Sequence, residues 1–247
     1  MADFEQEKLT YHLAELRKTI LSIIICLLLL FPVGYFLAPY SIDWLINKSF
    51  FNQNFTLNFF SPMEVFLVNL KIGFVIAFII GFPFIVYKIW QFLLPALYDK
   101  EKKFIKMAVF CSTFLFILGA AICVAFVLPL IIKFSMSFAT DKIQPILGIS
   151  NFLALSGWLM LAFGLMFQFP IAIYFLVKFD IVSIEVLQNK RPYVIIILLF
   201  TAALLTPPDV VSQLLLFVPT YLLFELGLLF AGFSKKLKTL FLFSHFL

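Results

Sequence analysis

Residues 202–225 read AALLTPPDVVSQLLLFVPTYLLFE, and this stretch decides how the chain is organised. Two apolar runs are separated by Pro207-Pro208-Asp209, and the second run ends at a carboxylate, Glu225. A rigid break between two short apolar runs is typical of a tight turn between two helices. The solvent around those helices follows from the composition of the whole chain.

The composition is that of a membrane protein. Of the 247 residues, 64% are hydrophobic and only 13% are charged. Soluble domains carry about 25% charged residues, because charge keeps a folded surface in water. The chain has too few charges to cover a globule, so the sequence predicts an integral membrane protein that contacts the lipid bilayer. We expect no nucleic-acid partner.

Six apolar stretches are the candidate membrane spans. Inside hydrocarbon every backbone N–H and C=O must be paired within its own segment, so helices are the structure that fits these stretches. The sequence therefore predicts an all-α polytopic fold with six transmembrane helices, and a single membrane domain that covers residues 1–247. The predicted spans are residues 19–38, 72–94, 107–132, 153–177, 193–205 and 213–233.

The distribution of lysine and arginine between the spans sets the orientation. One side of the predicted membrane carries fourteen of these residues and the other side carries four, Lys48, Lys71, Lys133 and Lys142. Cytoplasmic loops carry the excess of positive charge. Both termini are therefore predicted to lie in the cytoplasm.

The last two predicted spans are short. The helix Tyr193–Leu205 would be about 20 Å long at 1.5 Å per residue, whereas the hydrocarbon core is about 30 Å thick. The sixth span has only Leu214–Phe224 before Glu225. Two explanations stay open: the lipid is locally thinned, or these helices are buried in protein.

A few polar residues lie within or beside the spans. Gln168 in span four precedes Pro170, and its amide either bonds the carbonyl freed by that proline or serves as a docking point for a partner. Glu225 is either close to the cytoplasmic interface or paired internally. Thr206 and Gln213 flank the Pro-Pro-Asp turn and could form a polar cluster at the external ends of spans five and six.

Two acids stand out on the predominantly basic cytoplasmic side. Glu15 precedes span one, and Glu101 follows span two. Exposed carboxylates of this kind commonly form local ion pairs, here with Arg17, Lys102 or Lys103. A carboxylate held in place is also what bidentate recognition of a guanidinium requires.

Nothing in the sequence indicates a metal, a cofactor or an enzymatic site. The three cysteines, Cys26, Cys111 and Cys123, lie inside apolar runs, and His12 and His245 are near opposite ends of the chain. The cysteines and histidines do not have the spacing of metal ligands, and the predicted spans contain no motif of an intramembrane hydrolase. We therefore expect a protein without catalytic residues, metal or cofactor.

Six motifs in order resemble one family. HLAELR, FFSPMEVF, WQFLLPALYDKE, NKRPY, LLTPPDVVSQ and LLFE are similar to segments of the TatC family, the receptor subunit of the twin-arginine protein translocase. The resemblance covers residues 9–232 and leaves no unassigned domain. The competing class, a secondary transporter or channel, is expected to show intramembrane charges along a path and helices broken near mid-membrane.

The resemblance implies a function in protein export. It implies that the chain binds twin-arginine signal peptides at the cytoplasmic face and assembles with single-span TatA/TatB-type subunits, and with further copies of itself, to export folded proteins. It also implies a multi-pass protein of the bacterial inner membrane; because no transit peptide is recognisable, we favour this membrane over an organellar one.

The resemblance also assigns roles to residues. Many members of the family carry a glutamate where this chain has Gln168, which puts in doubt any role that needs a charge there. The resemblance implies that Glu15 and Glu101 receive the paired arginines, at a site shaped by Arg17, Phe92 and Pro95. It implies that Thr206 and Gln213 belong to the partner-binding cluster, with Gln168 and Glu225 as further intramembrane polar residues. It also implies that Pro207, Pro208 and Asp209 form the external turn.

Overall fold

The structure is a computed structural model of the whole chain. It describes residues 2–49, 57–93, 102–137, 148–179, 181–206 and 210–244, and the side chains of residues 13–48, 57–93, 105–137, 148–179, 181–206 and 210–232. The predicted turn Pro207-Pro208-Asp209 and the predicted site residues Pro95 and Glu101 lie outside these ranges.

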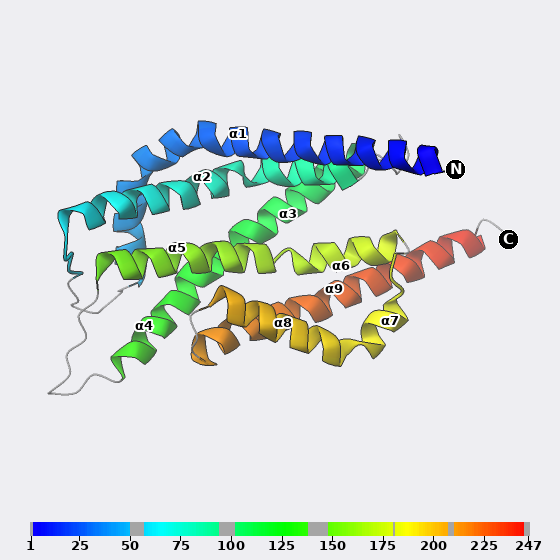
Figure 1. Cartoon of the computed structure of the whole chain (residues 1–247). Helices are drawn as coiled ribbons and strands as arrows, with labels where there is room; N and C mark the ends of the chain where they lie inside the picture. The colour runs from blue at the N-terminus through cyan, green and yellow to red at the C-terminus, as the bar shows by residue number, and fades with distance from the viewer. Residues whose placement is uncertain are drawn as a thin grey trace. The chain divides into compact units, whose positions relative to one another are not determined.

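The described residues are almost entirely helical (Figure 1). The predicted all-α fold is therefore confirmed. A five-residue π-helical turn, Cys123–Val127, joins two of the helices, and the described residues contain an isolated bridge, Asn58 with Gly148, but no longer strand. The helices are α1 (Ala2–Ser49), α2 (Pro62–Leu93), α3 (Lys102–Ile122), α4 (Leu128–Met136), α5 (Ile149–Met166), α6 (Phe169–Lys178), α7 (Ile184–Asn189), α8 (Arg191–Leu205) and α9 (Val210–Ser244).

These helices contain the six predicted apolar segments. Five of the segments are long and apolar enough to cross a membrane, and α8 is a shorter apolar helix of 15 residues. The helix α9 continues past Glu225 to Ser244, so any shortness of span six depends on the depth of Glu225 and not on the end of the helix. The five long segments are Leu13–Lys48, Pro62–Leu93, Ile105–Met136, Ile149–Lys178 and Val210–Gly232.

The contacts between residues divide the chain into two compact units, and each is described by itself. The first unit comprises Met1–Phe114 and Ile146–Gly157. The second unit comprises Leu115–Pro145 and Trp158–Leu247. The prediction of one membrane domain over residues 1–247 stays a prediction.

In the first unit, α1 and α2 run antiparallel and cross at two glycines (Figure 1). A Cβ atom added at Gly34 would collide with the backbone oxygen of Gly73, and one added at Gly73 would lie 3.0 Å from the Cα of Tyr35. Small residues allow two helix backbones to approach this closely in a membrane, where van der Waals packing replaces the hydrophobic effect as the force between helices. The two glycines therefore set the register of α1 on α2.

The start of α2 is joined to the start of α5 in the same unit by hydrogen bonds. The carboxylate of Glu64 accepts a hydrogen bond from the backbone N–H of Phe60 at 2.8 Å and another from that of Ser150 at 3.2 Å. The backbone N–H of Ile149 donates to the carbonyl of Asn58 at 2.9 Å. One carboxylate thus satisfies N–H groups at the beginnings of two helices, which are otherwise unpaired.

In the second unit, α6 and α8 both pack against α9. Ile173 of α6, Leu198 of α8 and Phe224 and Leu228 of α9 form a buried apolar cluster. A Cβ atom added at Gly227 would lie 2.9 Å from the Cα of Pro170, so α6 and α9 also approach closely. This packing fixes the position of α8 on α9.

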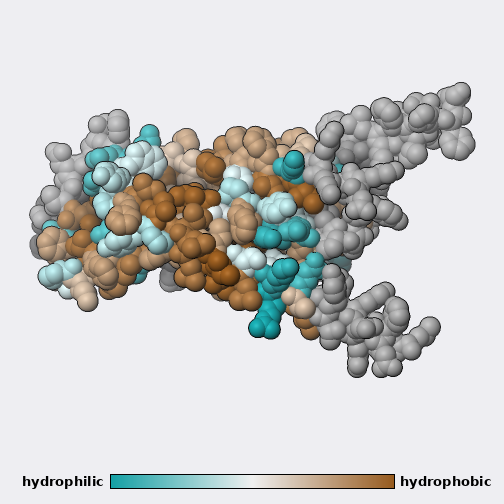
Figure 2. Space-filling model, turned by 90° about the horizontal axis from the view of Figure 1, so that it is seen from above, coloured by the Kyte–Doolittle hydropathy of each residue, from teal (hydrophilic) through white to brown (hydrophobic). Residues whose placement is uncertain are grey.

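Apolar side chains cover much of the outer surface. Figure 2 shows hydrophobic residues over a large part of one face of the described surface. The most apolar window of the α1 span is only 6% buried. Such a surface is what a helix exposes to lipid, and it agrees with the composition.

Candidate functional site

Three of the five residues predicted to bind the signal peptide are described by the structure. Glu15 and Arg17 lie near the N-terminal end of the α1 span, and Phe92 lies at the C-terminal end of α2. Glu15 and Phe92 are half-buried, and Arg17 is exposed.

One oxygen atom of the Glu15 carboxylate has no hydrogen-bond partner among the described residues. Its Oε2 atom is shielded from solvent, and it accepts no hydrogen bond from the described residues. Neither Arg17 nor Lys18 forms an ion pair with it, although Lys18 is three residues further along the same helix, where a pair is possible. A shielded carboxylate oxygen is costly unless a donor reaches it.

The register of α1 on α2 brings Phe92 to the level of Glu15. Gly34 contacts Gly73, and Gly81 has Leu27 and Leu30 as neighbours. Because both α-helices rise 1.5 Å per residue, this antiparallel register continues along the pair. The end of α2 at Phe92 is therefore level with the turn of α1 that carries Glu15.

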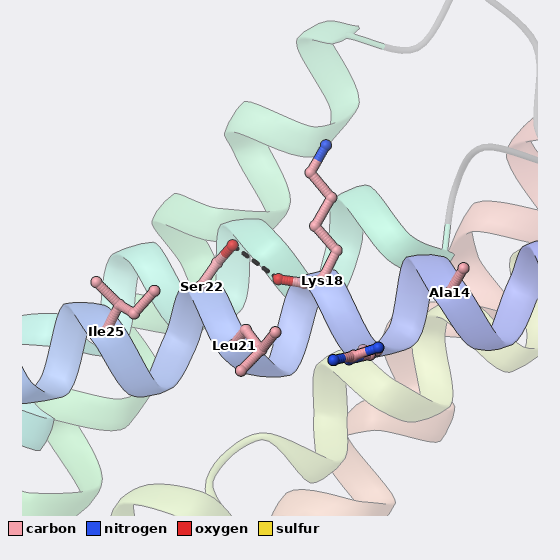
Figure 3. Close-up of a pocket in the computed structure, with 6 residues that line it drawn as sticks. Ala14, Lys18, Leu21, Ser22 and Ile25 are labelled. Carbon is pink, nitrogen blue, oxygen red and sulfur yellow. Dashed lines mark hydrogen bonds between the residues drawn. The ribbon is translucent and has the colours of Figure 1, made fainter.

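An open hollow of about 420 Å³ lies along α1, and its lining includes Ala14, the residue before Glu15. In Figure 3 its lining follows one face of the helix, and the Ser22 hydroxyl donates a hydrogen bond to the Lys18 carbonyl at 2.8 Å. The lining combines positive charge with apolar surface. It consists of Ala14, Arg17, Lys18, Leu21, Ser22 and Ile25.

The predicted polar cluster is assembled around the last two turns of α8. Thr206 is buried, ends the helix in an extended conformation, and donates its hydroxyl to the carbonyl of Ala202 at 2.8 Å. Gln213 of α9 donates its side-chain amide to the carbonyl of Leu199 at 3.1 Å. Both polar side chains therefore bond to α8 within one short stretch.

Sequence analysis missed Trp158, a third side chain at this end of α8. Its indole N–H donates to the carbonyl of Leu205 at 2.6 Å, across 47 residues of sequence. A single tryptophan in an apolar run carries no pattern that reveals such a partner, so the bond could be found only in three dimensions.

Gln168 lies at a break in span four. It precedes α6, and its side-chain amide donates to the carbonyl of Gly164 at 3.3 Å. Proline at 170 frees the carbonyl of Met166, four residues earlier, so the accepting carbonyl is a different one from the one that sequence analysis considered. Whether Gln168 also serves as a docking point stays a prediction.

Glu225 is paired internally. Its Oε2 atom lies 2.8 Å from the Nη2 atom of Arg191, and its Oε1 atom accepts a hydrogen bond from the Tyr221 hydroxyl at 2.9 Å. Sequence analysis left the pairing of Glu225 open and did not identify either partner. The spacing of Tyr221 and Glu225, four residues apart on one helix, was the signal for that contact.

The described residues contain no group of three or more histidine, cysteine, aspartate or glutamate side chains that could hold a metal ion. In the first unit, the described polar groups include the Glu15 carboxylate, one oxygen of which lacks a described hydrogen-bond donor. The second unit offers a set of hydrogen-bonding side chains around the end of α8.

Comparisons with known proteins identify the family. The model of the family "Sec-independent protein translocase protein (TatC)" matches residues 11–219. The Sec-independent protein translocase protein TatC of Haemophilus influenzae is 38% identical over 240 residues, covering 94% of this chain and 91% of that protein. The protein of the same name from Escherichia coli is 34% identical over 232 residues, covering 93% of this chain and 90% of its own length.

A solved structure agrees with these relatives. A crystal structure of the twin-arginine translocase receptor TatC superimposes with a TM-score of 0.81 and 32% sequence identity, and it covers 89% of this chain and 99% of its own. The predicted family, polytopic fold and export function are thus confirmed, and the function is not enzymatic. The chain belongs to the TatC family and is a multi-pass inner-membrane subunit of the twin-arginine protein translocase, which it forms with other Tat subunits.

Proposed function

We propose that this subunit binds the paired arginines of twin-arginine signal peptides through Glu15 and Glu101, at a cytoplasmic site shaped by Arg17, Phe92 and Pro95. The observation that carries the proposal is the shielded Oε2 atom of Glu15, which no described residue bonds. A guanidinium supplies parallel N–H donors in the geometry that a carboxylate accepts.

The arrangement of the first unit supports two carboxylates at one level. Phe92 is level with the turns around Glu15, and Glu101 follows it by nine residues in the sequence. Glu101 lies outside the described residues, so its place beside Glu15 is part of the proposal. Two carboxylates near one another match two consecutive arginines better than they match a single cation.

The positive charge near Glu15 gives the site selectivity. Arg17 and Lys18 follow Glu15 by two and three residues on the same helix, and both line the hollow. Because like charges repel, these two residues make binding unfavourable for any cation that does not form hydrogen bonds to a carboxylate. A lysine ammonium is a point charge and loses the bidentate geometry, so an Arg-Arg pair should be preferred over Lys-Lys.

The experiment compares a twin-arginine peptide with its Lys-Lys version on the purified subunit in lipid nanodiscs. Each bond between a carboxylate and a guanidinium contributes about 1.5–3 kcal/mol, so Glu15→Gln or Glu101→Gln should weaken Arg-Arg binding roughly ten- to a hundredfold. Both substitutions should also remove most of the preference for Arg-Arg over Lys-Lys.

The matched control is Glu185→Gln, which removes a carboxylate from α7. It should leave both the affinity and the preference unchanged. Full affinity and full preference in both Glu15→Gln and Glu101→Gln would place the receptor site elsewhere. Equal binding of the Arg-Arg and Lys-Lys peptides to the unmodified chain would contradict recognition of the paired arginines by this subunit alone.

We propose further that a single-span TatA/TatB-type subunit docks along α8 and α9, with its polar contact at Thr206 and Gln213. Each of these two helices presents an exposed apolar stripe that can receive a helix in lipid. Gln213 uses its amide N–H on Leu199, and in the described part of the chain its carbonyl oxygen has no partner, so it can accept a bond from the docked helix. The two stripes are Tyr193, Ile196, Phe200 and Leu204 on α8, and Val210, Leu214, Val218 and Leu222 on α9.

Site-specific cross-linking tests this docking. A photoreactive residue at Leu204 or Leu214 should capture the single-span subunit of the same organism, and Gln213→Leu should lower the yield several-fold because it removes the acceptor. A photoreactive residue at Leu29, which is exposed on α1 in the first unit, serves as the control. Equal capture from Leu29 and from Leu204 would contradict a specific surface on α8 and α9. Copies of the chain within the same complex would appear as cross-links between two full-length chains.

A further inference from the structure

The strongest unassigned contact in the second unit joins spans four and five. The indole N–H of Trp158, the first residue of the unit on α5, donates to the carbonyl of Leu205, the last residue of α8, at 2.6 Å. The bond is short for an N–H donor and connects two residues that are 47 positions apart in the sequence.

The carbonyl of Leu205 lies at the C-terminal end of α8, where the last carbonyls of a helix lack intrahelical donors. In a continuing helix the carbonyls of Ala203 and Leu204 would accept from residues 207 and 208, but both are prolines and have no N–H. Thr206 is extended (φ −108°, ψ 158°), so α8 ends at Leu205. The carbonyl of Leu205 therefore receives no hydrogen bond from a further turn of this helix. In a membrane an unpaired carbonyl is costly, and the indole of Trp158 removes that cost at Leu205.

Packing in the interior does not explain why residue 158 is a tryptophan. The side chain of Trp158 is 53% exposed, so much of its ring lies on the surface while its N–H bonds the end of α8. Tryptophan with one apolar and one hydrogen-bonding end is typical of membrane interfaces. The contact therefore joins the end of α8 to an exposed tryptophan, close to the surface on which a partner helix is proposed to dock.

Three spans meet on the last turns of α8. Trp158 of span four bonds Leu205, Thr206 closes α8 on Ala202, and Gln213 of span six bonds Leu199. Thr206 directly follows the residue that Trp158 bonds, and Gln213 reaches back to a carbonyl two turns earlier. A shift of the end of α8 would therefore move both polar groups that are proposed to receive the partner.

We propose that Trp158 is a positioning residue for partner docking: its bond to the Leu205 carbonyl sets the depth and direction of the external end of α8, and through it the positions of Thr206 and Gln213. This inference rests on the docking function proposed above and names a residue outside the docking surface that this function needs. Trp158 acts through α8 and is not required to touch the partner.

The test removes the N–H and keeps most of the ring. Trp158→Phe should reduce capture of the single-span subunit by a photoreactive residue at Leu204 about five- to tenfold, the loss expected for one hydrogen bond and the carbonyl it leaves unpaired. Trp158→His, whose ring can still donate, should retain more of the capture than Trp158→Phe. Hydrogen exchange of the amides around Leu205 should become faster in Trp158→Phe.

The matched control is Trp44→Phe, the same substitution at a tryptophan of similar exposure (57%) on α1, in the other unit. It should leave partner capture unchanged. Both variants should bind the twin-arginine peptide with unchanged affinity, because the peptide site lies in the first unit. This second readout separates positioning of α8 from a general loss of folding.

Two results would overturn the proposal. One is capture in Trp158→Phe that stays within twofold of the unmodified chain. The other is a loss of peptide binding and of thermal stability in proportion to the loss of capture, which would make Trp158 a general structural residue. If the unmodified chain gives no cross-link from Leu204, the docking function fails instead, and hydrogen exchange around Leu205 still decides whether Trp158 holds α8.

Discussion

Arg191, the first residue of α8, is ion-paired with Glu225 partway along α9, with 2.8 Å between the guanidinium and the carboxylate. The other end of α8 is held at Leu205 by Trp158. The short apolar helix α8 is thus fixed at both ends by polar contacts to two other helices, α9 and α5. Because α8 has 15 residues, the two contacts are about 21 Å apart along its axis.

The ion pair should be visible as a coupling between two substitutions. Arg191→Met or Glu225→Gln alone should destabilise the fold in lipid-like detergent, because each leaves its partner without a counter-charge. The double variant should lose about 1 kcal/mol less than the sum of the two single losses, since the pair is half-exposed and not fully buried. The measurement is a double-mutant cycle by denaturant titration, and strict additivity would contradict a functional pair.

The crossing of α1 and α2 should tolerate no side chain at Gly34. Its Cβ would collide with the backbone oxygen of Gly73 and lie 3.0 Å from the backbone nitrogen of Ala77, and backbone atoms cannot move aside as a flexible side chain can. We expect Gly34→Ala to cost about 1–3 kcal/mol and Gly34→Leu to cost more. Thermal unfolding in detergent measures this loss.

Gly232 is the control for that prediction. A Cβ atom there meets no atom within 4 Å, so Gly232→Ala should be neutral or slightly stabilising because alanine is the better helix former. Equal destabilisation by the substitutions at Gly34 and Gly232 would mean that loss of glycine flexibility, and not the close approach to α2, is responsible.

The external fastening should depend on the charge of Glu64. Its carboxylate receives the N–H groups of Phe60 and Ser150, and it lies in the first turns of α2, where a negative charge is favourable. Glu64→Gln keeps one acceptor oxygen and removes the charge, and should cost about 0.5–2 kcal/mol, as the loss of a helix cap does. Asp43→Asn, an exposed acid on α1, should cost nothing measurable.

Hydrogen exchange gives the Glu64 prediction a local readout. Protection of the amides of Phe60 and Ser150 should fall together in Glu64→Gln, although they are ninety residues apart in the sequence. Loss of protection at Phe60 alone would show that the carboxylate caps only its own helix.

The sequence predicted the elements of this fold better than the contacts between them. Composition and the pairing rule for backbone in lipid were sufficient to predict six apolar helices. The partners of Glu225 and the bond from Trp158 to Leu205 depend on which helices are neighbours. Local patterns of apolar residues say little about this, because in a membrane nearly every helix face is apolar.

For the candidate site, the sequence indicated which residues are involved and predicted on which side of the membrane they lie. It did not indicate their hydrogen-bond or ion-pair partners. The carboxylate of Glu15 stood out in a basic surrounding, yet the sequence equally allowed an ion pair with Arg17. Only the structure distinguishes a paired carboxylate from the shielded, unbonded oxygen found among the described residues. In the same way Gln168 was identified as a polar residue beside Pro170, but its bond to Gly164 follows from the local break in span four.

The chemistry of Gln168 separates a structural role from a docking role. Gln168→Leu removes the donor to the carbonyl of Gly164, and the variant should lose about 0.5–1.5 kcal/mol of stability while staying folded and inserted. If Gln168 is also a docking point, this variant should weaken capture of the single-span subunit or insertion of the signal peptide beyond that loss. Gln168→Glu should be tolerated, and complete loss of the protein from the membrane in Gln168→Leu would favour a purely structural role.

The length of α8 makes a prediction about the surrounding lipid. A helix of about 21 Å cannot cross a hydrocarbon core of about 30 Å without thinning it or being shielded by protein. Its side chains Tyr193 and Leu204 are both exposed, at 60% and 66%, so shielding by this chain does not explain the mismatch.

Spin labels at these two positions should both report depths close to the polar interface, on opposite sides of the bilayer, as oxygen and nickel accessibility measure them. Labels at Leu21 and Phe36 of α1, which are also exposed and 15 residues apart, serve as the comparison, because α1 continues as a helix beyond both and need not bring either to an interface. If the label at Tyr193 or at Leu204 lies more than about 5 Å inside the hydrocarbon of an otherwise ordinary bilayer, α8 does not span the membrane at that thickness. Thinning around α8 would then be excluded, and partner subunits would have to supply the protein that covers it.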